Sequence, residues 1–497
     1  MKKLFFLTLF FSITLFAKID TEAYSRWLLN KGDLLVDKGK YLEAIEAYDS
    51  SIETTNNKKI KIDATLRRVN VLLLYLDQKK EAKENLYKIY KNYPTSKEAE
   101  YALYNIAMIE KDLNTTKAKL LFKEYTKKYP NGKYLFQAKY FIKYLKEPIK
   151  PTPTIQKLIK TPYIRVLLKK NIKIVNLKGN LEIDNTKTKN ATFYFKNGYI
   201  IYNSNKYKTL LIKSNKPIFI KEKNNSYYGN IKLVAKKRGI YLINIVDIPH
   251  YLYGVITSES YSKWNIEALK AQAVASRTYA YYQTLVRKHW LYDVRDNTFD
   301  QVYNGVKGIT KKSKLATNST KGQILTYNNK PILAQYMANA GWYVSSSKEI
   351  FNTNLPYLYS HKDDFSIKAT YGKWQKKVKI EIIEKNLQKL GIKVEGIKEI
   401  LPYEVTKSGR VVKVKIIANN GNVILRTYNS IRRAAKLKDI LLKKIEKKDG
   451  YFHFYGGGFG HGVGYSQWGG AIMAKNGYNY KKILNFYYYN CKLIKKW

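Results

Sequence analysis

The 497-residue chain has few of the residues that disulfides and zinc sites need. It contains one cysteine, Cys491, so an internal disulfide cannot form, and an oxidising compartment would be tolerated but not exploited. Its five histidines, at positions 250, 289, 361, 453 and 461, have no paired cysteines near them. This spacing does not predict a zinc site. We therefore expect no metal and no cofactor.

Acidic residues are scarce as well. Asp and Glu number 38 against 91 Lys and Arg, which gives a formal net charge of +53. Such a charge reflects either a bias in composition or attraction to polyanions such as anionic lipids, wall polymers or nucleic acid. Nucleic-acid readers favour Arg for bidentate contacts, and this chain is dominated by Lys. We therefore expect no nucleic-acid partner.

Long apolar runs are absent beyond the N-terminus. Lysines at positions 2 and 3 precede an apolar run over 4–16, and the small residue Ala17 follows it. This pattern predicts a secretory signal peptide over residues 1–17, and thus export to the periplasm or cell envelope. Leu15 is large for a position three residues before the cut. The alternative is therefore a signal that stays uncleaved and anchors the protein in the membrane.

Proline and glycine are rare in residues 20–145, and the apolar pattern there has a helical period. One helical face carries Tyr41, Ala44, Ile45 and Tyr48. The turn sequences Tyr93-Pro94 and Tyr129-Pro130 lie 36 residues apart, and each leads into a helix with a small alanine. A helix-turn-helix unit with this period resembles tetratricopeptide repeats. An unrelated helical bundle is the alternative.

A change of composition separates these helices from the rest of the chain. Residues 146–162 contain four prolines and several lysines, which predicts an extended linker. From residue 163 onward, runs of β-formers alternate with Asn, Gly and Lys turns, and a long helix is expected over 266–288. The expected fold is thus an all-α repeat domain over 20–145, followed by an α+β region over 163–497.

The most informative segment surrounds Glu259. Tyr253, Tyr261 and Trp264 flank this residue in what we expect to be a loop before the helix that Asn265 caps. An apolar aromatic environment raises the pKa of a carboxyl group, so that it can act as a general acid at neutral pH. On these residues alone, a solvated surface glutamate is the alternative interpretation.

Three ordered blocks resemble the stage II sporulation protein D (SpoIID) and LytB family of wall enzymes. The first block comprises residues 251–255 (YLYGV), Glu259, 267–273 (EALKAQA) and 277–279 (RTY), the second 300–305 (DQVYNG), and the third 458–471 (GFGHGVGYSQWGGA). The resemblance covers roughly residues 163–497. It implies a lytic transglycosylase that acts on peptidoglycan glycan strands from which the stem peptides have been removed.

The implied reaction needs one carboxyl group. Glu259 would protonate the oxygen between N-acetylmuramic acid and N-acetylglucosamine, and would then accept the proton of the C6 hydroxyl that attacks C1. The product would be a 1,6-anhydro end. By analogy, Lys270 and Arg277, which lie two helical turns apart, would hold the lactyl carboxylate or steady Glu259.

Further candidates for substrate binding or support come from the second and third blocks: Asp300, Gln301, Tyr303, His461 and Gln467. The dense glycines of the third block permit close approach of the main chain to a substrate; a tight structural turn with a buried histidine is the alternative. Two features depart from the family. The position two after Glu259, often proline, is Tyr261, and residues 334–342 lack the usual histidine. We therefore assign no substrate contact and no metal to residues 334–342.

Other functions fit parts of the sequence. Members of the family have been described as amidase enhancers, so the chain could be a non-catalytic wall-binding protein that recruits a wall amidase. Asp300 could serve as a second carboxylate for hydrolysis, and a thiol peptidase could use Cys491 with His461. We expect the helical repeats to dock a protein partner, while residues 163–497 act on glycan by themselves.

Overall fold

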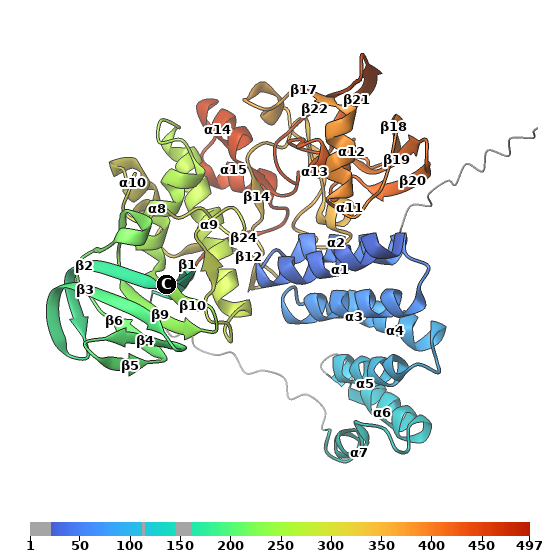
Figure 1. The fold of residues 1–497 in the computed structure, drawn as a ribbon, viewed down its shortest axis with the longest axis horizontal. Helices are drawn as coiled ribbons and strands as arrows, with labels where there is room; N and C mark the ends of the chain where they lie inside the picture. The colour runs from blue at the N-terminus through green and yellow to red at the C-terminus, as the bar shows by residue number, and fades with distance from the viewer. Residues whose placement is uncertain (1–20, 112–114, 146–160) are drawn as a thin grey trace, which may run out of the picture.

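The structure is a computed structural model that describes residues 21–111, 115–145 and 161–497. The predicted signal peptide and residues 146–160 of the predicted linker lie outside these ranges. Figure 1 shows a helical N-terminal part beside a larger region that mixes strands and helices, which confirms the expected fold class. Within the described ranges, no helix has the length and apolar character needed to cross a membrane.

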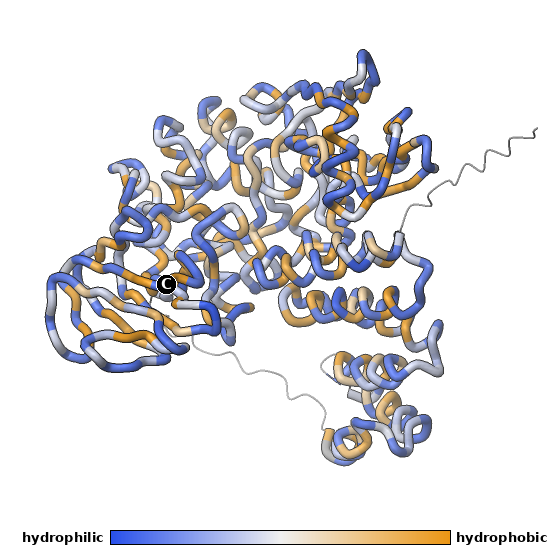
Figure 2. The backbone as a smooth tube through the Cα atoms, in the orientation of Figure 1, coloured by the Kyte–Doolittle hydropathy of each residue, from blue (hydrophilic) through white to orange (hydrophobic). Residues whose placement is uncertain are grey.

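The N-terminal region folds as the expected helical repeats. Its described helices are α1 (Thr21–Asp37), α2 (Tyr41–Thr54), α3 (Lys58–Leu74), α4 (Lys79–Asn92), α5 (Lys97–Lys111), α6 (Thr115–Lys128) and α7 (Leu135–Tyr144). The turns at Tyr93-Pro94 and Tyr129-Pro130 join α4 to α5 and α6 to α7. Ala102 and Ala138 are fully buried, as close helix packing requires. Figure 2 shows hydrophobic and hydrophilic residues alternating along these helices, because one face of each packs inward.

Two sheets open the second region. Their strands are β1 (Tyr163–Ile172), β2 (Ile174–Ile183), β3 (Thr186–Lys196), β4 (Tyr199–Tyr202), β5 (Asn205–Tyr207), β6 (Thr209–Ile212), β7 (Ile218–Ile220), β8 (Asn225–Tyr227), β9 (Asn230–Lys236), β10 (Gly239–Asp247) and β11 (Val294–Arg295). One sheet has the order β11-β1-β10-β9-β6 and the other β5-β4-β3-β2-β7-β8. Strand β10 pairs antiparallel with β1 and ends at Asp247, where the chain enters the helices that carry Glu259.

A central helix organises the next layer. α9 (Ile266–Val286) lies close to what we expected and is buried along most of its length. Its neighbours are α8 (Ile248–Glu259), α10 (Lys311–Ser319), β12 (Gln323–Tyr327), α14 (Gln467–Lys475) and α15 (Tyr480–Tyr487). Segments about 200 residues apart in sequence therefore meet on one helix.

The remaining elements bring the later sequence blocks together. β14 (Tyr336–Met337) pairs in parallel with β23 (Tyr465–Ser466), and Asn339 bridges to Phe459, so residues 334–342 lie along the glycine-rich block. The other elements are β13 (Lys330–Pro331), β15 (Tyr343–Val344), α11 (Ser347–Phe351), β16 (His361–Lys362), β17 (Trp374–Lys379), α12 (Ile380–Gln388), β18 (Ile397–Val405), β19 (Val411–Ala418), β20 (Gly421–Arg426), α13 (Ile431–Ala434), β21 (Leu441–Lys448), β22 (Tyr451–Gly457) and β24 (Lys492–Lys495).

The helical repeats pack against the α+β region, a contact that the sequence did not predict. Figure 1 shows α2 beside α11 and β20, while α5–α7 project away. Buried polar groups join the two parts: Arg287 Nε donates to Tyr41 Oη at 2.6 Å, and Asn429 Nδ2 donates to Glu46 Oε2 at 2.7 Å. In α1, Tyr24 and Leu28 belong to the same hydrophobic core as β17–β22. The two regions therefore form one folded body at this interface.

Candidate active site

Glu259 is the last residue of helix α8, not a loop residue as its sequence context indicated. Asp247 caps the start of α8 by accepting the His250 N–H, and Pro249 occupies its first turn, where no intrahelical donor is needed. Ser260 ends the helix in an extended conformation. Glu259 is therefore fixed by a helix end, which is a more rigid support than a loop.

Three donors surround the Glu259 carboxyl group. The Val302 N–H donates to Oε1 at 2.7 Å, Gln467 Nε2 reaches Oε2 at 3.4 Å, and the Tyr336 hydroxyl adds a further hydrogen bond. Burial raises the pKa of Glu259, and these three hydrogen bonds oppose the rise only in part. The group is thus suited to hold a proton above the pH at which an exposed glutamate loses it.

A cavity of about 500 Å³ opens beside this carboxyl group. Separate parts of the chain line it: the corner between α1 and α2, residues 298–300, residues 335–338, the pair Tyr428 and Arg432, and residues 459–461 with Gln467. Strand β23, which follows the first glycines of the glycine-rich block, pairs with β14, which contains Tyr336. Both segments therefore lie beside Glu259.

Two other carboxyl groups line the cavity, and both are held by cations. Asp300 is fully buried: Arg287 donates to its Oδ1 at 2.9 Å, Tyr279 to the same atom at 3.1 Å, and the Arg295 N–H to Oδ2 at 2.9 Å. Glu43 pairs with Lys40 at 2.9 Å. Among the described residues that line the cavity, Glu259 is the carboxyl group without a cationic partner.

Gln301 and Tyr303 support the site from behind. Gln301 is fully buried, and its Nε2 donates to the Tyr336 hydroxyl at 3.1 Å, so it orients a group that touches Glu259. Tyr303 donates its hydroxyl to Asn244 at 3.1 Å and packs beneath Gly254 of α8. We therefore assign both residues to positioning and neither to contact with a substrate.

Lys270 and Arg277 do not reach Glu259, contrary to the role that the resemblance implied. Lys270 pairs with Glu267 at 2.7 Å. Arg277 is buried and donates to the Thr317 carbonyl at 3.0 Å and to the Thr320 hydroxyl. Arg277 therefore contacts α10 and β12, and Lys270 lies over the Tyr480 ring of α15.

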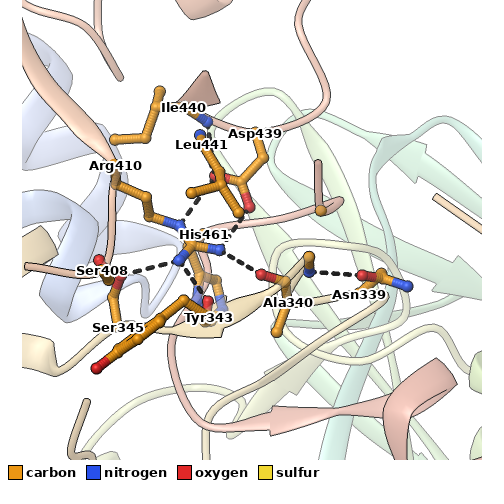
Figure 3. Close-up of polar contacts among 12 residues, drawn as sticks. Asn339, Ala340, Tyr343, Ser345, Ser408, Arg410, Asp439, Ile440, Leu441 and His461 are labelled. Carbon is orange, nitrogen blue, oxygen red and sulfur yellow. Dashed lines mark hydrogen bonds and ion pairs between the residues drawn. The ribbon is translucent and has the colours of Figure 1, made fainter. Parts of the chain in front are cut away.

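His461 lines the cavity. It lies next to a buried ion pair, as Figure 3 shows. Arg410 and Asp439 are both fully buried and pair at 2.9 Å, and Arg410 also donates to the Ala340 carbonyl at 2.9 Å. The Val463 N–H donates to His461 Nδ1 at 3.1 Å, which leaves the ring proton on Nε2. Burial, with help from the nearby Lys40 charge, lowers the pKa of His461 to about 3. His461 is therefore a neutral donor and not an acid or base for the reaction.

The aromatic surroundings differ from those expected. Tyr253 points elsewhere and donates to Asn318, while Tyr261 and Trp264 form a cluster with Trp468. The aromatic groups that line the cavity are instead Tyr279, Phe299, Tyr336, Tyr428 and Phe459. Tyr336 belongs to the segment that the sequence marked as unusual, whereas no local pattern marks Tyr428.

No group of three or more His, Cys, Asp or Glu side chains in the described part of the chain is arranged to hold a metal ion. Cys491 lies just before β24, half-buried, and burial raises the pKa of its thiol to about 12. Such a thiol is a poor nucleophile. This argues against the thiol peptidase alternative.

The fold and site define a helical-repeat protein with a cleft in its α+β region, where Glu259 is the carboxyl group without a cationic partner among the described lining residues. Family models match three segments: a stage II sporulation protein model over residues 236–327, a domain of unknown function over 328–464, and a tetratricopeptide repeat over 101–132. The chain is 30% identical over 259 residues to stage II sporulation protein D of Bacillus subtilis, covering 49% of this chain and 73% of that protein.

The chain belongs to the stage II sporulation protein D family. It is also 30% identical over 269 residues to an uncharacterized protein of Brachyspira hyodysenteriae, covering 54% of this chain and 72% of that protein. An amidase enhancer of Bacillus subtilis is 28% identical over 283 residues, which covers 48% of this chain and 39% of that protein.

Proposed function

We propose that this protein is an exported lytic transglycosylase that cleaves peptide-stripped peptidoglycan strands in the cell envelope. The observation that carries the proposal is the single uncompensated carboxyl group of Glu259 in a cavity whose other carboxylates are ion-paired. Hydrolysis with inversion needs a second free carboxylate to activate water. Asp300 accepts three hydrogen bonds and is poorly suited to that role.

In the proposed reaction Glu259 acts twice. Its proton passes to the oxygen that joins C1 of N-acetylmuramic acid to N-acetylglucosamine, and the C1–O bond breaks. The C6 hydroxyl of the same muramic acid then attacks C1, and its proton passes to the Glu259 carboxylate. The strand is cut, the new end is a 1,6-anhydro ring, and no water is consumed. Glu259 finishes protonated, ready for another cycle.

The neighbouring groups have roles that follow from their contacts. The Val302 N–H and Gln467 stabilise the carboxylate after it gives up its proton. The Nε2–H of neutral His461 can donate to a sugar hydroxyl or acetamido oxygen in the cavity. Phe299, Tyr336 and Phe459 offer flat apolar faces against which sugar rings pack.

The test is a digest of purified, peptide-stripped glycan by the full-length protein, read by mass spectrometry. We expect anhydro-muramic ends from the wild type and a loss of roughly 10³-fold or more in rate for Glu259→Gln, which keeps the shape of the side chain but carries no proton. Glu399→Gln, an exposed carboxylate change on β18, is the matched control and should cleave like the wild type.

A second candidate function comes from the relative named amidase enhancer. In that case the cleft would bind glycan without cutting it, and the protein would speed a wall amidase. The two proposals are separated when the digest is run beside a second arm, in which a wall amidase acts on peptide-bearing peptidoglycan with and without the protein. No anhydro ends, together with faster release of stem peptides by the amidase, would favour the enhancer role.

A further inference from the structure

One wall of the cavity beside Glu259 comes from the helical repeats. The corner between α1 and α2 places Gly39, Lys40 and Glu43 along the cavity. Lys40 is largely buried, with 23% of its side chain exposed, and its ammonium pairs with Glu43 at 2.9 Å. The free N–H groups at the start of α2 add positive potential at the same place.

Lys40 faces the catalytic block across the cavity. Among charged groups, its ammonium does most to lower the pKa of His461. The Asp300 carboxylate in turn helps to raise the pKa of Lys40. Since all three residues line the same space as Glu259, Lys40 lies within the cleft and not on an outer rim.

A second cation enters the cavity from the opposite part of the chain. Arg432 belongs to α13, and its guanidinium group lies over the Tyr428 ring, 4.6 Å from the centroid. Its Nη2 donates to the Lys438 carbonyl at 3.4 Å, while its Nε is buried and has no hydrogen-bond partner among the described residues. Because this Nε is buried, a ligand in the cavity would meet the outer Nη atoms of the guanidinium group.

The charges of this end of the cavity do not balance. Lys40 and Arg432 carry two positive charges, and Glu43 carries the one negative charge that offsets them. Asp300 does not count, because Arg287 already neutralises it. A half-buried site with surplus positive charge fits an anionic group, and a planar carboxylate suits the guanidinium fork.

We propose that Lys40 and Arg432 form a carboxylate subsite, so that the helical repeats are part of the substrate-binding cleft. This inference rests on the proposed function. A glycan strand of alternating N-acetylglucosamine and N-acetylmuramic acid carries hydroxyls and neutral amides, and its one ionised group is the lactyl carboxylate. That carboxylate is free only after the stem peptide has been removed, because the peptide is joined to the same carboxyl group through an amide bond. The subsite therefore binds peptide-free strands in preference to strands that keep their stem peptides.

The experiment measures binding of strands to the full-length Glu259→Gln protein, so that no cleavage is needed. Three ligands are compared: peptide-free strands, the same strands with their lactyl carboxyls converted to neutral methylamides, and strands that keep their stem peptides. Lys40→Met and Arg432→Met are introduced singly into this background. Lys127→Met, an exposed lysine of α6 far from the cavity, is the matched control.

We expect the unmodified cleft to bind peptide-free strands roughly tenfold to hundredfold more tightly than methylamide strands. Lys40→Met and Arg432→Met should each remove most of this difference, and Lys127→Met should leave it intact. The ligand comparison in the Glu259→Gln protein does not depend on how the cation variants fold.

Equal binding of the peptide-free and methylamide strands would overturn the inference, as would absence of binding to both. Tighter binding of the peptide-bearing strands would overturn it too, because the anion would then be a stem-peptide carboxylate. Cleavage by the wild type tests the proposed function separately: a protein that cuts strands without this carboxylate preference would keep the function and lose the subsite.

Discussion

Glu259 depends on its surroundings for the proton that the proposed reaction needs. Burial raises its pKa, three hydrogen bonds offset that rise in part, and no cationic partner among the described residues lowers it further. His461 lies in the same cavity but is held neutral by burial and by Lys40. The two groups therefore have separate roles, one as proton carrier and the other as hydrogen-bond donor.

The pH dependence of cleavage follows from this division. The free enzyme is active when Glu259 is protonated, so kcat/KM should be flat at acidic pH and fall as the pH rises through the raised pKa of Glu259. His461, with a pKa of about 3, should add no limb near the usual pKa of histidine. The measurement is kcat/KM from about pH 4 to about pH 9. A limb near neutrality that vanishes in His461→Gln would contradict this assignment.

Stability should respond to the same carboxyl group. A raised pKa means that the folded state holds the proton more tightly, so the contribution of Glu259 to stability is lost as the pH rises from the ordinary to the raised pKa. Above that window the ionised group is a cost that Gln does not carry. Glu259→Gln should therefore raise the free energy of unfolding by about 0.5–2 kcal/mol at alkaline pH and by less at acidic pH. Denaturant melts at several pH values would show it, and a gain that does not change with pH would argue against a raised pKa.

The corner between α1 and α2 connects the repeats to Arg287, which holds the cavity residue Asp300. Gly39 has a φ of +66°, and a Cβ at this residue would overlap the Arg287 guanidinium group. Arg287 holds Asp300 and Tyr41, so one side chain links the repeats to the segment beside Gln301. The element that shapes the cleft is thus a turn with no room for a side chain.

Gly39→Ala should be far more damaging than the same change at a free turn. Gly477 has a φ of +84° and nothing within 4 Å of its Cβ position, so Gly477→Ala should cost about 1–2 kcal/mol, the strain of a left-handed residue. Gly39→Ala adds displacement of a buried ion pair, for which we expect a total loss of about 3–5 kcal/mol. Denaturant unfolding measures both. Equal losses would mean that Arg287 moves aside freely.

The elements that the sequence predicted well are those with a local signal. The helical period of 41–48, the turns at Tyr93 and Tyr129, and the long helix after Asn265 all reflect short-range rules, and each forms as expected. The two-turn spacing of Lys270 and Arg277 also places them on one side of α9. It could not reveal that this side faces α10 and α15, because that depends on packing between distant segments.

The motifs pointed to Glu259 and Gln467, whereas nothing in the sequence showed that Val302 and Tyr336 also contact Glu259. The donors Val302, Tyr336 and Gln467 come from three separate segments that only the pairing of β14 with β23 and the packing around α9 bring together. Lys40 lies more than 200 residues from Glu259 in sequence, and nothing in its local pattern distinguishes it from the many other lysines.

At the level of the whole molecule, the repeats and the α+β region share an interface with buried polar contacts and a common hydrophobic core. This interface argues against the expectation that residues 163–497 act on glycan by themselves, which stays untested. Without the repeats, Arg287 would lose Tyr41, Asn429 would lose Glu46, and the core around Phe454 would lose Tyr24 and Leu28. α5–α7 project away from this interface.

A chain of residues 161–497 should accordingly be less stable and less active than the full-length protein. We expect a fall in Tm of more than about 10 °C or poor solubility, because buried apolar side chains become exposed and polar partners are lost. Thermal melts and the glycan digest compare the two chains. A truncated protein with the Tm and activity of the full chain would show that the interface contributes nothing to either.

The central claim is that one carboxyl group cuts the strand by internal transfer, and the most direct measurement is a digest in water enriched in the heavy oxygen isotope. Peptide-stripped strands are incubated with the full-length protein, and the new ends are examined by mass spectrometry. The account predicts anhydro-muramic ends without the label, and no such ends with Glu259→Gln. Labelled reducing ends would show attack by water and would contradict it.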